Sequence, residues 1–185
     1  MKAINNFENV QATTGEFKRP TAGGYCIEIL TVKDVPMNAQ TGKGDYIKID
    51  YDICHGEFKG YYTKQNEKFG GNWFASFIRS YKESALGMFK HFISCVETSN
   101  VGYRWDWNER GLVGKYVGVV LGEEEYEKNS GDIGIRLVVK DIKTTEQIVR
   151  GDFEIPDIKK LERKNPSPSE VAFIPMSASD DLPFN

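Results

Sequence analysis

Residues 45–54 contain the clearest alternation of apolar and polar side chains in the chain, and this pattern constrains the fold most. The apolar positions share one face of an extended segment: Ile47, Ile49, Tyr51 and Ile53. The polar positions share the other face: Tyr46, Lys48, Asp50 and Asp52. A period of two is typical of a strand with one buried face. The chain must therefore build a sheet that covers the isoleucine face.

Similar alternation predicts four further strands, and they are expected at residues 25–35, 58–64, 114–126 and 133–142. Residues 128–132 are expected to form a hairpin turn. The segment 64–82 is rich in aromatic residues and interrupted by glycine, so we expect a long, partly ordered excursion there. Residues 84–96 show helical spacing of apolar side chains, with Ser84 as the expected N-cap.

The predicted order is strand, strand, strand, helix, strand, strand. This order predicts an all-β fold with one helix, namely the OB-fold, a five-stranded Greek-key barrel with its helix between strands three and four. Glycines recur inside the predicted strands, where a tightly bent barrel would need them: Gly60, Gly118 and Gly134. Another small barrel or an α+β sandwich fits the same pattern.

The length of 185 residues suits one domain with an appendage. We expect the domain to span residues 1–163, with a lead-in arm over 1–20 and a short cap over 144–163. Residues 164–185 begin in a segment rich in Pro and Ser and are expected to form a flexible tail.

Composition limits the environment of the protein. The sequence has no run of about 18 apolar residues, so we expect no membrane span, and its N-terminus lacks the apolar stretch of a signal peptide. Cys26, Cys54 and Cys95 are far apart in sequence, a pattern that favours buried thiols in a reducing compartment. We therefore expect a cytoplasmic protein with no cofactor and no metal site.

The last nine residues form a compact recognition peptide. Asp180 and Asp181 can meet a basic rim, Pro183 keeps the backbone extended, and two apolar side chains, Leu182 and Phe184, can fill a pocket. An ordinary frayed terminus is the alternative interpretation. This ending resembles the acidic tip of bacterial and bacteriophage single-stranded DNA-binding proteins, which recruits replication and repair proteins. The chain departs from that pattern because Asn185 follows the phenylalanine.

The body carries a second resemblance, in short pieces that are specific through their order: Gly23-Gly24-Tyr25, Gly44-Asp45-Tyr46, the run 56–62, and the runs 112–115 and 124–126. Together with the tail they resemble phage-encoded single-stranded DNA-binding proteins of Gram-positive hosts. The resemblance implies an OB-fold that binds single strands without catalysis during phage DNA replication or recombination.

Binding an unpaired strand without sequence preference requires aromatic faces for bases and cations for phosphates. The chain interleaves both kinds of side chain, and the candidate DNA-binding residues are Lys43, Tyr46, Lys48, Lys59, Tyr61, Lys64, Lys68, Trp73, Arg79, Tyr81, Arg136 and Lys140. We expect Tyr46 and Lys48 to face outward because their neighbours on the opposite face are apolar. For each aromatic, core packing is the alternative, and for each cation a solvated surface charge. The net charge of −3 is not that of a strongly basic nucleic-acid binder.

Two other function classes compete with DNA binding. One is an interaction adaptor whose tail recruits a partner without contact to DNA. The other is a Mg²⁺-dependent nuclease, since Glu57 and Lys59, with Asp45 or Asp50, form a weak version of a metal-binding pattern. A homo-oligomer would raise affinity through multivalency, but the sequence identifies no interface.

Overall fold

The computed structural model describes residues 18–71 and 75–162, and in these it shows a five-stranded antiparallel sheet with few helices. The strands are β1 (Gly23–Val35), β2 (Tyr46–Ile53), β3 (Ser76–Ser80), β4 (Tyr116–Glu127) and β5 (Ile133–Lys143). The α-helices are α1 (Tyr61–Phe69), α2 (Leu86–Ser99) and α3 (Thr145–Arg150). The predicted mainly-β character is confirmed, whereas the expectation of a single helix is wrong.

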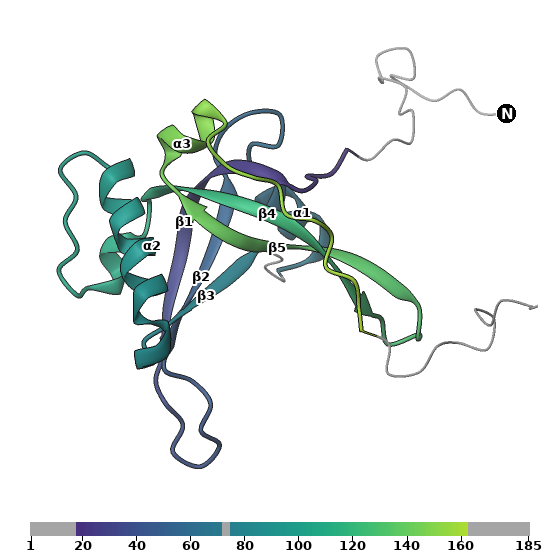
Figure 1. The fold of residues 1–185 in the computed structure, drawn as a ribbon, viewed down its shortest axis with the longest axis horizontal. Coiled ribbons are helices and arrows are strands. Elements are labelled where there is room, and N and C mark those ends of the chain that lie inside the picture. Colours follow the sequence, from purple (N-terminus) through teal and green to yellow (C-terminus); the bar gives the residue numbers. More distant parts are fainter. Residues whose placement is uncertain (1–17, 72–74, 163–185) are drawn as a thin grey trace, which may run out of the picture.

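The sheet has the order β3-β2-β1-β4-β5, so the long strand β1 lies at its centre. Register shifts between Ile29 and Thr31 and between Val120 and Leu121 interrupt the ladders and increase the local bend and twist of the sheet. Strands β3 and β5 form its two edges, and the sheet is not closed. In Figure 1, α2 packs beside one side of the sheet, α3 lies near one end, and the β4–β5 hairpin projects away from both.

The core lies on the isoleucine face of β2, as the alternation predicted. Ile47 and Ile49 are completely buried. Strands β1 and β4 bury their own apolar sides in the same cluster, and α2 contributes Phe92 and Val96. The helix predicted between the third and fourth strands is thus confirmed, and its apolar stripe completes the core.

The third strand was predicted at the wrong place. Residues 58–64 form a turn followed by the start of α1, and the third strand is β3, within the segment that sequence patterns left untyped. Gly60, the residue before α1, has a φ of 71°. This left-handed conformation costs glycine little. The alternation in this segment therefore does not reflect a strand, since residues 57–60 form a turn and residues 61–64 begin α1.

Two helix boundaries also differ from the sequence prediction. Ser84 lies in a short 3-10 helix, Glu83–Ala85, and does not cap α2; Ala85 takes that position without a side-chain hydrogen bond. The segment after β5 forms the predicted short cap, since α3 begins with reciprocal hydrogen bonds between Thr144 and Gln147. None of the helices within residues 18–71 and 75–162 is long and apolar enough to cross a membrane.

Of the three glycines expected inside strands, Gly118 and Gly134 lie in β4 and β5 and allow close packing, whereas Gly60 lies outside the strands. A Cβ on Gly118 would lie 2.5 Å from Cγ1 of Ile148 and 2.7 Å from the carbonyl oxygen of Thr144. Gly118 of β4 therefore lets α3 lie directly on the sheet. Gly134 makes similar room for the ring of Tyr126. Only the absence of a side chain allows these approaches.

We predict that Gly118→Ala lowers the free energy of unfolding by about 1–3 kcal/mol, because the added methyl group overpacks the contact with α3. Gly87→Ala is the matched control, since a Cβ there meets nothing within 4 Å and Gly87 lies in α2. That change should raise stability by about 0.5–1 kcal/mol. Urea unfolding measures both. A Gly118→Ala protein as stable as the wild type would contradict the packing of α3.

Candidate nucleic-acid interface

The side of β1–β2–β3 that faces away from the core carries cations and apolar groups in adjacent rows. Lys33 of β1 lies opposite Lys48 of β2, which in turn lies opposite Ile78 of β3. Tyr46 occupies the neighbouring row on the same face. We call this surface, defined by Lys33, Tyr46, Lys48 and Ile78, the outer face. The structure therefore places Tyr46 and Lys48 on one face, as predicted.

The outer face has more positive than negative charge in its central rows. Like charges directly opposite each other on paired strands are destabilising, and Lys33 and Lys48 are in this position. One carboxylate offsets them: Asp50 Oδ1 lies 3.3 Å from Nζ of Lys48, and Asp50 Oδ2 accepts a hydrogen bond of 2.7 Å from Thr31. Asp50 thus pairs with Lys48, and Lys33 makes no ion pair among the described residues. An anion placed between the lysines would relieve the repulsion.

The outer face also offers apolar surface beside its charges. Ile78 is 52% exposed, although it lies at the middle of a strand. Tyr46 is half-buried beside it. Flat or branched apolar groups next to cations suit a ligand that carries both rings and anionic groups, because bases stack on side chains while phosphates pair with cations.

A second group of predicted residues lies on or near α1, and a buried carboxylate positions this helix. Asp52 of β2 is 5% exposed and accepts hydrogen bonds from the backbone N–H groups of Tyr62 and Thr63, at 3.0 and 2.9 Å. Gly60 at the N-cap offers no side chain, so Asp52 satisfies the first turn of α1 from a neighbouring strand. The sequence pattern did place Asp52 opposite the isoleucines, but not in this role.

The rings that follow Asp52 form a connected cluster. The ring centroids of Tyr61 and Tyr62 are 5.3 Å apart, and those of Tyr62 and Tyr51 are 5.8 Å apart. Burial raises the pKa of the Tyr62 hydroxyl to about 12. Tyr62 therefore belongs to the core, whereas Tyr61 remains half-buried at its border.

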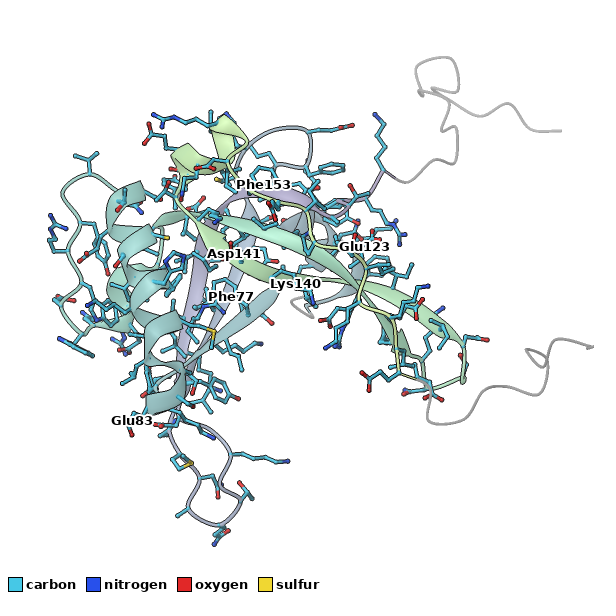
Figure 2. All side chains as sticks on the ribbon, viewed as in Figure 1. Phe77, Glu83, Glu123, Lys140, Asp141 and Phe153 are labelled. Atoms are coloured by element: carbon cyan, nitrogen blue, oxygen red, sulfur yellow. The ribbon has the colours of Figure 1, made fainter. Side chains whose placement is uncertain are left out.

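A cavity of about 370 Å³ lies between α1 and β5, and we call it the α1–β5 cavity. Aromatic, polar and cationic side chains line it, among them Arg19, Tyr61, Gln65, Phe69, Glu123 and Arg136. The cavity thus joins two residues of the sequence prediction, Tyr61 and Arg136. Figure 2 labels Glu123, which lies near the part of the sheet from which the β4–β5 hairpin projects.

Two cations of β5 share one carboxylate, Glu124, on the face of the β4–β5 ladder opposite to that of Glu123. Lys140 donates to Glu124 at 2.5 Å, and Arg136 donates to the same side chain at 3.2 Å. The hydrogen bond from Lys140, together with that from Arg136, holds the pKa of Glu124 below its usual range. Glu124 therefore stays ionised, and the pair of cations exceeds it by one charge.

Other predicted site residues are engaged by the fold. Arg79 lies on the core side of β3, where its guanidinium covers the ring of Phe77 at 4.8 Å. Burial lowers the pKa of Arg79, and Asp141 of β5 opposes that shift. The Tyr81 hydroxyl donates to Asp34 at 3.2 Å, and its ring packs on Phe89. These contacts indicate structural roles for both residues.

The remaining predicted residues are spread over the surface or lie outside the described parts. Lys43 is exposed in the β1–β2 loop, and Lys59 and Lys64 border a separate cavity with Glu28 and Glu67. Lys68 lies near the end of α1, 5.4 Å from the ring of Phe69. Trp73 and the tail residues Asp180, Asp181, Leu182, Pro183 and Phe184 are outside the described residues.

Sequence reasoning missed Lys33, Ile78, Arg19 and Phe69. Lys33 was within a predicted strand, and pairing that strand with the next in register would have placed it opposite Lys48. Ile78 had no such signal, because β3 was not recognised as a strand.

Within the parts of the chain that the structure describes, no three His, Cys, Asp or Glu side chains gather in a way that could hold a metal ion. Glu57, one member of the proposed nuclease pattern, pairs with Lys18 at 2.8 Å. A scan of the sequence against protein-family models found no match, and a search of curated proteins found none.

We predict that Asp52→Ala destabilises the protein by about 1–3 kcal/mol, because two amides of α1 lose their buried acceptor. Asp52→Asn is the matched control. Its side-chain amide oxygen can still accept a hydrogen bond, so its loss of stability should be smaller. Urea unfolding measures the change in the free energy of unfolding. The dependence of that free energy on urea concentration is compared between the variants. Equal stability of wild type and Asp52→Ala would show that the carboxylate does not hold α1.

Proposed function

We propose that this chain binds single-stranded DNA without sequence preference and that the unpaired strand lies across the outer face. The carrying observation is the cross-strand pair Lys33 and Lys48 beside Tyr46 and Ile78. Phosphates meet the lysines, and bases stack on the neighbouring ring and apolar side chain. Stacking and phosphate pairing are both independent of base identity, so little sequence preference follows.

The architecture supports a more specific proposal, an OB-type barrel that is open between β3 and β5. In the described sheet, β1 pairs with both β2 and β4, and α2 connects β3 to β4. This matches the order expected for an OB-fold. Helix α2 contacts both edge strands, β3 and β5.

The resemblance of body and tail extends the proposal to a biological setting. The protein then protects single strands in the cytoplasm of a bacterial host during phage replication or recombination. Residues 180–184 recruit other replication or recombination proteins, and Asp180 and Asp181 compete weakly with DNA for the cations.

We predict that the double change Lys33→Ala and Lys48→Ala weakens binding to labelled oligo(dT) and makes it less dependent on salt. The slope of log affinity against log salt should flatten by about 0.7 for each phosphate that no longer meets a lysine, or about 1.4 for two phosphates. Fluorescence anisotropy at several salt concentrations measures this slope. Lys90→Ala is the control, because Lys90 is an exposed lysine of α2 and its removal should leave the slope unchanged.

Two outcomes would replace the proposal. Wild-type protein that binds no oligo(dT) at low salt, while its tail still captures partners, would be an adaptor. Cleavage of the oligonucleotide that depends on added Mg²⁺ would indicate a nuclease.

We predict that deletion of residues 177–185 abolishes capture of replication proteins and raises affinity for oligo(dT) severalfold at low salt, because two competing carboxylates are removed. Pull-down and anisotropy measure the two effects. The double change Asp180→Asn and Asp181→Asn should reproduce the gain in affinity. A deletion that changed neither property would refute the role of the tail.

A further inference from the structure

The α1–β5 cavity is a separate site from the outer face, because it shares none of the four residues that define that surface. Its volume of about 370 Å³ lies within the range of small-ligand pockets, about 300–1,000 Å³. It is bordered by a helix on one side and a strand on the other. An elongated surface groove would accept a backbone, whereas a pocket of this size accepts one compact group.

The lining favours a flat ring with hydrogen-bonding edges. Tyr61 and Phe69 of α1 offer aromatic surface, and Leu137 of β5 adds apolar surface. Gln65 can both donate and accept hydrogen bonds, and Glu123 accepts them. A nucleobase combines such a ring with N–H donors and carbonyl acceptors.

The cations at the same cavity favour an attached phosphate. Arg19 makes no ion pair among the described residues and lines the cavity together with Arg136. The guanidinium of Arg136 is paired with Glu124, so Arg19 is the cation at the cavity that carries no such partner within residues 18–71 and 75–162. Planar guanidinium groups bind phosphate oxygens in pairs. Ring surface, polar edge groups and phosphate-binding cations thus meet in one place.

We infer that the α1–β5 cavity holds one unpaired nucleobase of the bound strand, with its phosphate directed toward Arg19 and Arg136. This inference rests on the proposed function and deepens it. A base inside the cavity cannot pair with a complementary strand, so the cavity selects against duplex DNA. An acidic peptide such as the tail fits less well, because it offers no ring with hydrogen-bonding edges to match Gln65 and Glu123.

The test fills the cavity without removing a proposed contact. Ile135 lines the cavity and is 45% exposed, and Ile133 lies on the same face of β5 outside it, 37% exposed. Ile135→Trp should abolish binding of thymidine monophosphate and weaken oligo(dT) binding about tenfold, the loss of one stacked base. Ile133→Trp is the matched control and should bind both probes as the wild type does.

A second variant guards against misfolding of the first. Gln65→Trp fills the same cavity from α1, and thermal unfolding followed by circular dichroism checks both proteins. Both filling variants should lose the mononucleotide, and their slope of log oligo(dT) affinity against log salt should flatten by no more than about 0.7, for the one phosphate at the cavity. Lys48→Ala should weaken oligo(dT) binding but still bind the mononucleotide.

The two proposals fail in different ways. Wild-type protein that binds no oligo(dT) overturns the proposed function. Wild-type protein that binds oligo(dT), but with an affinity that folded Ile135→Trp and Gln65→Trp leave unchanged, overturns only the assignment of the cavity. The same conclusion follows if a peptide of residues 177–185 binds the cavity and thymidine monophosphate does not.

Discussion

The hydrogen bonds from the first turn of α1 to the buried Asp52 carboxylate determine how the rest of the molecule is arranged. They fix the first turn of α1 against β2, and in this position Tyr62 enters the core while Tyr61 and Phe69 border the α1–β5 cavity. The same strand presents Lys48 on the outer face. One strand, β2, therefore carries part of the outer face and also the carboxylate that positions α1 beside the cavity.

Local pairing of charges explains how a chain with a net charge of −3 can offer cationic surfaces. Several acids are already engaged by the fold: Glu124 by two cations of β5, and Glu97 by the backbone of Trp105 and by Arg104. On the outer face, Asp50 pairs with Lys48, and no other ion pair involves Lys33 or Lys48 among residues 18–71 and 75–162. Net charge is thus a poor guide to binding here, because binding depends on which charges remain uncompensated on one face.

Regular alternation made much of the sheet predictable. The isoleucines of β2, the β4–β5 hairpin and the apolar stripe of α2 all follow from short-range periodicity. Residues 58–64 could not be assigned this way, because the acceptor of the backbone hydrogen bonds that start α1 is Asp52, which lies earlier in the chain. Tyr46 and Lys48 were placed correctly by alternation alone. Lys33 and Ile78 depend on the pairing of three strands, which a single segment does not reveal, and the cavity requires α1 and β5 to meet.

The most direct test of the account is a map of backbone amide chemical shifts in ¹⁵N-labelled protein as oligo(dT) is added. The account predicts the largest changes at Lys33, Tyr46, Lys48 and Ile78, with a second group along α1 and β5 at Gln65 and Ile135. The amide chemical shifts of residues on the exposed side of α2, such as Lys90, should not change. Changes confined to α2 and the loop that follows it, with the outer face unaffected, would contradict the proposed binding surface.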